Sequence, residues 1–347
     1  MSVEHQHLTY YGYATEWYFR LYQDLMSDYQ EIACRQGLAY ESPHSFSAVI
    51  PSTDNNFSSM LASAHMPRRG NLPQRITFSI LYSLRRLLGY HDTALVDKYP
   101  ILAKYIPMIT KPFYSRSTHY NRLDIPNELQ GSAWIHKEKV FGSDTYFIDQ
   151  FERAVFLLGE PENRLSKRAL IDFGEGYKAR CVLSWLFVNR NEKMRIYQSM
   201  RSNDLTVGLP NNLCDARLAQ GIIAASVGSN IGEVHHQSML MQIYKKDIAG
   251  VDCDDEMKKL LANAQSSTIA EIANQIKQIP IVEKINEILY PYLGKPSNSG
   301  KDSIKQYHSI MNALELVFWD NNAECKQENR HCVEHLIGRH IIAKEIL

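Results

Sequence analysis

The chain has 347 residues, of which 44% are hydrophobic and 22% are charged, an ordinary composition for a globular protein. Lysine plus arginine and aspartate plus glutamate both number 38, so the formal net charge is zero and does not support a general attraction to nucleic acid or to an anionic membrane. Because no apolar run approaches the roughly 20 residues that span a bilayer, and the six cysteines form no paired framework behind a secretory segment, we expect a cytoplasmic protein with reduced thiols.

The first half of the chain predicts mainly helices. Apolar residues at fourfold spacing predict a helix over residues 14–36. The stretch 40–75 is rich in serine, proline and asparagine and is expected to be irregular. Further helices are predicted over 75–89 and 147–159, each ended by a glycine, while residues 92–135 show no clear period.

The second half of the chain mixes strands and helices. Strands are predicted at 168–173, 181–188 and 194–200, with a turn at 189–193 between the last two. The small and apolar stretch 213–227 predicts a buried helix. A further strand is predicted at 234–244, and from about residue 255 the pattern is helical, with a Pro/Ser/Gly break at 291–300. The chain is therefore expected to have a mixed α+β centre with helical material at both ends.

Residues 201–212 form a dense polar run, Arg-Ser-Asn-Asp-Leu-Thr-Val-Gly-Leu-Pro-Asn-Asn. An arginine beside a serine can hold a phosphate, because the guanidinium offers a fixed fork of donors and the hydroxyl adds one more. Asn212 can donate and accept at once, as the edge of a pyrimidine requires. Cys181 stands twenty residues upstream (201 minus 181) and is a candidate nucleophile. This combination predicts a nucleotide site with covalent chemistry.

At these residues the chain resembles the thymidylate synthase superfamily, which includes the deoxypyrimidylate hydroxymethylases. That family has an Arg-Ser-x-Asp-x-x-x-Gly-Leu-Pro-x-Asn run, preceded at this spacing by its catalytic cysteine. The resemblance implies an α+β fold with a mainly antiparallel sheet core, flanking helices and a back-to-back homodimer. It divides the chain into an N-terminal helical and irregular extension (1–70), a nucleotide-binding core (71–250) and a helical C-terminal region (251–347).

The resemblance also implies roles for the polar run. Cys181 would add to carbon 6 of the pyrimidine, and Arg201 and Ser202 would bind the phosphate. Asp204 would accept hydrogen bonds from backbone and base-side groups, and Asn212 would read the pyrimidine edge, where an asparagine fits uracil. The alternatives are a small core residue for Cys181, an exposed strand end for the Arg-Ser pair, a turn-capping aspartate and a helix N-cap for the asparagine.

Two more segments carry the resemblance less closely. Lys167 and Arg168 resemble the arginine pair through which the neighbouring subunit reaches the phosphate; the lysine keeps the charge but not the bidentate fork. Tyr244 aligns with a tyrosine that hydrogen-bonds the sugar hydroxyl. The usual histidine two residues earlier is Gln242 here, which can still form a hydrogen bond.

The chain departs from the family at several points. Tyr82 stands where the family has a glutamate that organises water and protons for one-carbon transfer, and Val182 replaces the histidine after the nucleophile. The early Arg-Thr-Gly-Thr phosphate loop is absent, with Arg68 or Arg69 as possible substitutes. A helical pattern after Tyr244 takes the place of the closing tail that folds over the folate.

Other signals are weaker. His331 and His335 are four residues apart and could face one metal from a helix, but the spacing fits no common zinc pattern, so no metal is expected. His235 and His236 are expected to be structural. The aromatic residues between Tyr10 and Tyr22 are expected to pack a helix on the core rather than to stack on bases.

The sequence therefore predicts a pyrimidine-nucleotide C5 one-carbon transferase, adding a methyl or hydroxymethyl group to a uridylate-type monophosphate. By resemblance, the donor is 5,10-methylenetetrahydrofolate. The alternative is a non-catalytic nucleotide-binding or interaction protein on the same fold, whose helical C-terminal region would be the partner surface. A nucleotide hydrolase or transferase that uses the pocket without folate is a third possibility. The expected catalytic residues are Cys181, Asp204 and Tyr82, and the expected substrate-binding residues are Arg201, Ser202, Asn212, Tyr244, Arg168, Lys167 and Gln242.

Overall fold

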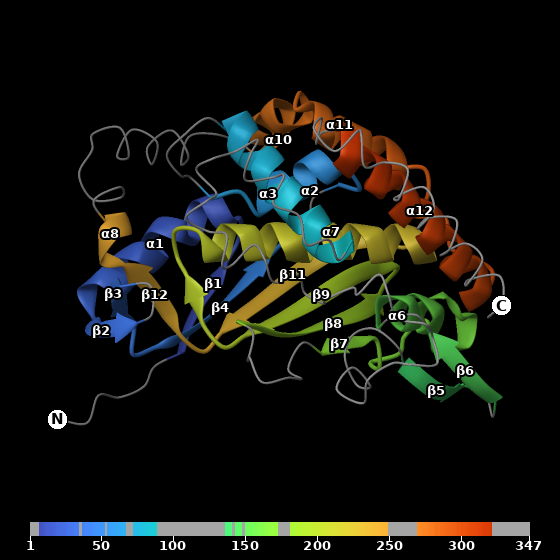
Figure 1. Cartoon of the computed structure of the whole chain (residues 1–347), viewed down its shortest axis with the longest axis horizontal. Coiled ribbons are helices and arrows are strands. Elements are labelled where there is room, and N and C mark those ends of the chain that lie inside the picture. The colour runs from blue at the N-terminus through green and yellow to red at the C-terminus, as the bar shows by residue number, and fades with distance from the viewer. Residues whose placement is uncertain are drawn as a thin grey trace.

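The structure is a computed structural model that describes residues 7–34, 37–52, 54–66, 72–88, 136–140, 143–147, 150–172, 181–248 and 269–320. In this part of the chain, helices pack on one face of a six-stranded sheet (Figure 1). The predicted mixed α+β class is confirmed.

The large sheet has the strand order β1-β4-β11-β9-β8-β7. Its strands are β1 (His7–Tyr11), β4 (Ser45–Ile50), β11 (Asn230–Ser238), β9 (Lys193–Met200), β8 (Val182–Arg190) and β7 (Leu170–Asp172). The pairs β4–β11, β9–β8 and β8–β7 are antiparallel, whereas β1–β4 and β11–β9 are parallel. The sheet is thus mainly antiparallel, as expected.

Apolar and polar side chains alternate along the strands, and the helices cover the face that carries the apolar ones. In β9, Met194, Ile196 and Met200 are buried, while Lys193 and Tyr197 are exposed. An antiparallel sheet with one packed face shows this pattern, because successive side chains point to opposite faces. The helices cover the apolar face, and the more polar face is open among the described residues (Figure 1).

A smaller four-stranded sheet has the order β10-β12-β3-β2. Its strands are β10 (Asn203–Asp204), β12 (Met241–Tyr244), β3 (Gly37–Glu41) and β2 (Gln30–Cys34), and a separate hairpin joins β5 (His136–Val140) to β6 (Ser143–Phe147). The single strand predicted at 234–244 is wrong: β11 ends at Ser238 in the large sheet and β12 begins at Met241 in the small one. The Ser238 hydroxyl donates to the Leu240 carbonyl at 2.7 Å and closes the turn between them.

One long central helix, α7 (Gly208–Val227), packs on the sheet and under the outer helices (Figure 1). Nearly all of its residues are buried, because it contacts strands on one side and helices on the other. It ends at Gly228, whose φ of 69° is the left-handed conformation that glycine adopts at helix ends. The other helices are α1 (Ala14–Ser27), α2 (Phe57–Ser63), α3 (Leu72–Leu88), α6 (Gln150–Gly159), α8 (Lys245–Ile248), α10 (Ile269–Lys277), α11 (Pro280–Leu289) and α12 (Gly300–Asp320), with a 3₁₀ turn at Pro161–Asn163.

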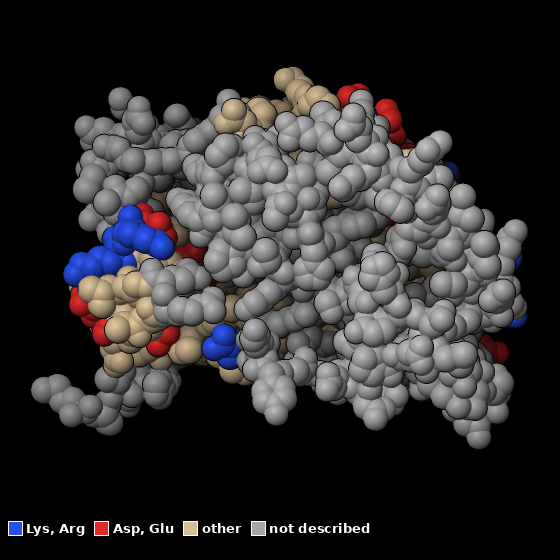
Figure 2. All heavy atoms as spheres, viewed as in Figure 1, with Lys and Arg blue, Asp and Glu red and all other residues tan. Residues whose placement is uncertain are grey.

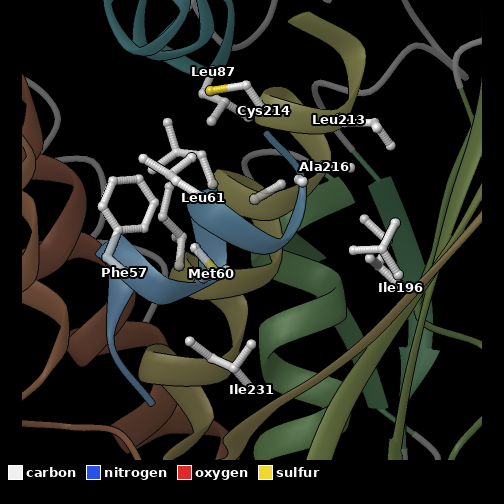
Figure 3. Close-up of a cluster of buried hydrophobic side chains, with 14 of the residues drawn as sticks. Phe57, Met60, Leu61, Leu87, Ile196, Leu213, Cys214, Ala216 and Ile231 are labelled. Carbon is white, nitrogen blue, oxygen red and sulfur yellow. The ribbon is translucent and has the colours of Figure 1, made fainter. Parts of the chain in front are cut away.

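The hydrophobic core lies on both sides of α7. Phe57, Met60 and Leu61 of α2 pack toward the helix, while Ile196 and Ile231 approach it from the sheet (Figure 3). All five side chains are at least 97% buried. This double contact fixes α7, and with it the residues of its first turns, relative to the strands.

Two predictions for the N-terminal part are wrong. The helix predicted over 14–36 ends at Ser27 and is followed by β2, and the stretch predicted as irregular at 40–75 contains β3, β4 and α2. In β4 the polar half of the alternation is mostly serine, Ser-Phe-Ser-Ala-Val-Ile, and the apolar half is buried. Because β1 and β4 pair within the large sheet, that sheet includes residues on both sides of the division predicted at residue 70.

The other element predictions hold where they fall on described residues. The helices predicted at 75–89 and 147–159 correspond to α3 and α6, and the helical region after residue 255 is interrupted at 291–300 as expected. Trp17 and Tyr18 of α1 are buried, which confirms helix packing for the N-terminal aromatic stretch. The predictions for 92–135 and for the histidines near the C-terminus lie outside the described residues. None of the helices described has the length and hydropathy of a membrane span.

Candidate active site

A β-hairpin brings the candidate nucleophile to the candidate phosphate ligands. Strands β8 and β9 are joined by Asn191 and Glu192, whose positive φ angles of 51° and 60° fit the tight turn that matches strand twist. At the open end, the Arg201 N–H donates to the Cys181 carbonyl at 2.8 Å. The spacing of twenty residues seen in the sequence (201 minus 181) is therefore the length of this hairpin.

The Cys181 thiol lies at the surface beside a hydroxyl. Cys181 is exposed, and Ser202 Oγ donates to its sulfur at 3.8 Å. Arg201 is exposed at the same end of the hairpin. The alternative that Cys181 is a small core residue is wrong, because its thiol is exposed next to the Ser202 hydroxyl, on a backbone paired with that of the exposed Arg201.

Asp204 organises the loop that leads into α7. Its carboxylate accepts from the Thr206 N–H and hydroxyl at 3.2 and 3.0 Å, and from the N–H groups of Val207 and Gly208 at 3.0 and 3.1 Å. The turn-capping alternative is thus confirmed. A role toward the base stays a prediction.

Asn212 lies in the second turn of α7, because the helix begins at Gly208, so the N-cap alternative is wrong. Its Nδ2 donates to Asn203 Oδ1 at 3.0 Å. Asn203 in turn contacts His236 at 3.2 Å, His236 contacts Gln198 at 2.7 Å, and Gln198 donates to the Asn212 carbonyl at 3.1 Å. These four residues close a ring of hydrogen bonds, which we call the amide ring.

Sequence reasoning did not place the other three members of the amide ring in the site. Gln198 and His236 occupy the inward phase of β9 and β11, where apolar residues are expected, and both are at least 98% buried. A polar residue in the buried phase of a strand must find a partner, because an unpaired buried polar group costs free energy. A polar residue at a position where the strand alternation predicts an apolar one was therefore the sequence feature that could have indicated this hydrogen-bond network.

The strand β12 brings the predicted sugar ligands beside Asp204, which pairs in register with Gln242. Gln242 Nε2 donates to the Tyr244 hydroxyl at 2.9 Å. Burial raises the pKa of Tyr244 above its ordinary value, and the neighbouring Cys34, Asp204 and Cys181 raise it further. The phenol therefore keeps its proton at neutral pH, and Tyr244 lies close enough to Cys181 for the two side chains to interact electrostatically.

Tyr82 lies on the helical side of the molecule. It is buried on α3 with its ring centroid 5.9 Å from that of Phe78. One turn earlier, Ser79 donates to Asn211 Oδ1 at 2.8 Å and links α3 to the start of α7.

Two more of the predicted ligands lie at the sheet edge. Lys167 and Arg168 are exposed on the segment that precedes β7. Arg68 and Arg69, the possible substitutes for the missing phosphate loop, lie outside the described residues.

Charge on the described surface is mixed rather than clustered. Over β2, β3 and α8, acidic and basic side chains lie next to each other (Figure 2), as in the 3.2 Å ion pair between Lys245 and Glu31. This agrees with the zero net charge of the chain.

Beside the first turn of α7, residues from α2 and α3 line a cavity of about 40 Å³, including Leu61, Ile76, Ser79 and Pro210. None of the predicted catalytic or substrate-binding residues lines this cavity.

Comparison with known proteins identifies this arrangement. The thymidylate synthase family model matches residues 128–286. A curated thymidylate synthase from Haloferax volcanii is 24% identical over 158 residues, which cover 42% of this chain and 46% of that protein. The chain thus spans slightly less than half the length of this relative. The hairpin, the Asp204 loop and α7 all lie inside the matched segment, so it is this part of the chain that is similar to the thymidylate synthase family.

Proposed function

We propose that this protein is a pyrimidine-nucleotide C5 one-carbon transferase in which Cys181 forms a covalent adduct with a uridylate-type monophosphate. The observation that carries the proposal is the exposed Cys181 thiol beside Ser202 and Arg201, at the open end of the hairpin. A thiolate is the nucleophile suited to this addition.

The chemistry follows from the electron flow in the ring. The sulfur of Cys181 bonds to carbon 6, and the π electrons of the C5–C6 bond move to carbon 5 and oxygen 4. Carbon 5 then forms a bond to an electrophilic one-carbon donor and gives up its hydrogen as a proton, and loss of the thiolate restores the C5–C6 double bond. Water displaces the donor's leaving group in a hydroxymethyl product, whereas a methyl product requires a hydride from the donor in its place. Tyr244, which keeps its proton, and Gln242 would hydrogen-bond the sugar, while Asn212 would contact the pyrimidine edge.

The phosphate would be held by two subunits of a homodimer. Arg201 and Ser202 come from one subunit, and Arg168 with Lys167 would come from its partner, since both are exposed at the sheet edge. The open face of the large sheet is the proposed dimer surface. It carries Tyr197, which stacks on His235 with ring centroids 4.3 Å apart.

The decisive experiment measures tritium release from 5-tritiated UMP, dUMP, CMP and dCMP, with and without methylenetetrahydrofolate. Release from one nucleotide requires addition at carbon 6 and names the substrate, and its dependence on folate identifies the donor. Cys181→Ala should abolish release but keep nucleotide binding. Cys214→Ala is the matched control, because burial raises the pKa of that thiol to about 12 and keeps it inert. Tight binding with no release from any of the four would favour the non-catalytic alternative.

The dimer is tested by subunit complementation. Cys181→Ala and Arg168→Ala should each be inactive alone, for different reasons. Mixed and allowed to exchange subunits, they should recover about a quarter of the activity, because one of the two sites in each mixed dimer has both residues intact. No recovery, despite subunit exchange measured with labelled chains, would contradict a shared phosphate site.

A further inference from the structure

The amide ring has one fixed reference point, the backbone carbonyl of Asn212. A carbonyl oxygen can only accept, so the group of Gln198 that contacts it at 3.1 Å is the Nε2 donor. The acceptor Oε1 of Gln198 must then face His236, at 2.7 Å from Nδ1. Because Oε1 cannot donate, His236 carries its proton on Nδ1.

The remaining two contacts follow from that tautomer. With the proton on Nδ1, the Nε2 of neutral His236 is an acceptor, and Asn203 Nδ2 donates to it at 3.2 Å. Asn203 Oδ1 is therefore left to accept from Asn212 Nδ2 at 3.0 Å. Each amide in the ring has one allowed orientation, and the orientation of Asn212 is set by Gln198 through two intermediates.

Three further observations lock this arrangement. Asn203 Nδ2 also lies 3.4 Å from the Met200 sulfur, a second acceptor that fixes the same orientation. Burial lowers the pKa of His236 to about 3, so its imidazole stays neutral at physiological pH. Gly208 leaves room for Asn203, since a Cβ there would lie 2.9 Å from Asn203 Oδ1.

The ring ends at the candidate site. Gln198, His236 and Asn203 are at least 97% buried, whereas Asn212 is 9% exposed. Its Nδ2 gives one hydrogen to Asn203, which leaves the second N–H and the Oδ1 for a ligand.

The orientation of this amide matters because uracil and cytosine present the hydrogen-bond donor and acceptor at position 4 and N3 in opposite order. Uracil presents an acceptor at O4 and a donor at N3, whereas cytosine presents a donor at N4 and an acceptor at N3. An amide pairs with either base, but only in opposite orientations. A freely rotating asparagine would accept both, and a fixed one rejects the wrong one.

We propose that the amide ring of Gln198, His236, Asn203 and Asn212 sets the choice between uracil and cytosine by fixing the Asn212 amide. The inference rests on the proposed function, in which Asn212 contacts the base. Gln198, His236 and Asn203 are then positioning residues, and the tautomer of His236, set by Gln198, determines the orientation of Asn203.

The test removes the Gln198 amide, which orients His236, and changes none of the residues proposed to contact the nucleotide. In Gln198→Leu, His236 loses the acceptor for its Nδ1 proton and gains by moving that proton to Nε2. Asn203 and then Asn212 must flip in response. The ratio of the dissociation constants of CMP and UMP, and of dCMP and dUMP, measured by calorimetry, should fall by about tenfold or more.

Gln198→Glu is the matched rescue. Burial favours the protonated acid, whose O–H donates to the Asn212 carbonyl while its other oxygen accepts from His236 Nδ1, so the orientation and the ratio should be kept. Gln275→Leu, an exposed change on α10, should leave the ratio unchanged. Asn203→Leu removes the last link and should lower the ratio as well, which guards against a misfolded Gln198→Leu.

A spectroscopic readout completes the test. In ¹⁵N NMR of the unliganded protein, His236 should be the Nδ1–H tautomer in the wild type and in Gln198→Glu, and the Nε2–H tautomer in Gln198→Leu. An unchanged ratio in folded Gln198→Leu and Asn203→Leu would overturn this inference alone. Failure of the wild type to bind any of the four nucleotides would overturn the proposed function with it.

Discussion

Two buried polar networks contact the same helix, α7, and they differ in what they connect. The amide ring joins side chains to one another and ends at Asn212 in the candidate site. The second network centres on Arg217, which lies five residues (217 minus 212) further along the helix and is fully buried. Arg217 donates to the carbonyls of Pro51 and Gly232 at 2.9 and 3.0 Å.

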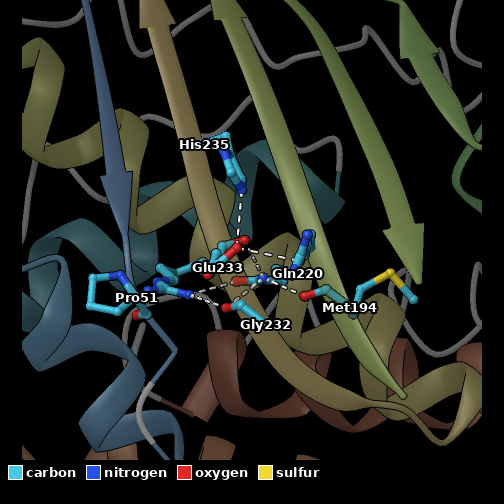
Figure 4. Close-up of polar contacts among 8 residues, drawn as sticks. Pro51, Met194, Gln220, Gly232, Glu233 and His235 are labelled. Atoms are coloured by element: carbon cyan, nitrogen blue, oxygen red, sulfur yellow. Dashed lines mark hydrogen bonds and ion pairs between the residues drawn. The ribbon is translucent and has the colours of Figure 1, made fainter. Parts of the chain in front are cut away.

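Gln220 extends the second network into the sheet (Figure 4). Arg217 also donates to Gln220 Oε1 at 2.9 Å and to Ser63 Oγ at 2.8 Å, and Gln220 Nε2 donates to the Met194 carbonyl at 2.6 Å. This network therefore ties α7 to the end of β4, to α2 and to two central strands.

The difference lies in the acceptors. A backbone carbonyl keeps its direction as long as the fold exists, so the Arg217 network holds elements in place and carries no alternative state. Side-chain amides and imidazoles can reverse donor and acceptor together, so the amide ring depends on its single backbone carbonyl, that of Asn212, to select one orientation, and that orientation can specify a ligand. One network serves the fold and the other serves recognition.

The largest expected effect is a loss of stability when the Arg217 network is removed, with no change in nucleotide preference. Arg217→Met should lower the free energy of unfolding by about 3–5 kcal/mol, because the buried carbonyls and the Ser63 hydroxyl would lose their hydrogen-bond donor. Urea unfolding followed by circular dichroism measures this. Any folded fraction should keep the wild-type preference between bases. A loss below about 1 kcal/mol would mean that water or neighbouring groups satisfy the carbonyls.

Two glycines give a matched intermediate comparison. A Cβ at Gly232 would lie 2.6 Å from the Met194 carbonyl oxygen, which belongs to the backbone of β9 and cannot move aside. Gly232→Ala should therefore cost about 1–3 kcal/mol. At Gly208 the nearest atom, 2.9 Å away, is the end of the Asn203 side chain.

Gly208→Ala should accordingly cost less than about 1 kcal/mol, since a side chain can shift. It should nevertheless weaken the preference between bases, because the shifted amide belongs to the amide ring. Thermal unfolding and nucleotide calorimetry on the two variants check the pair. Equal stability losses with no change in nucleotide preference would remove the distinction between the networks.

The smallest effect concerns pH. Burial lowers the pKa of His236 to about 3, below an ordinary value near 6.5. Between these two pKa values the imidazole is protonated in the unfolded chain but not in the native protein. The free energy of unfolding therefore falls as the pH drops below about 6.5, by up to about 1.4 kcal/mol per pH unit. His236→Gln should show a shallower fall between pH 7 and pH 5 than the wild type. Identical slopes would show that His236 is not the group responsible.

Sequence reasoning recovered the parts of the molecule that are local in the chain. The hairpin that joins Cys181 to Arg201 was predictable because both strands and their turn are contiguous, and α3 and α6 have clear helical periods. The strand β4 was missed because its polar face is made largely of serines, which also mark loops. The amide ring was missed because its partners meet only through the register of β9 with β11, in which Gln198 pairs with His236.

The position of β4 in the large sheet has a consequence for the order in which the protein folds. Its partner β11 pairs Val234 with Ile50, positions separated by 184 residues (234 minus 50). A nascent chain therefore exposes β4 with an unpaired edge until β11 has been synthesised, and the closure entropy of that long loop must be overcome before the sheet is complete. Folding should be slow for a protein of this size, and its early intermediates should be the forms most prone to aggregation.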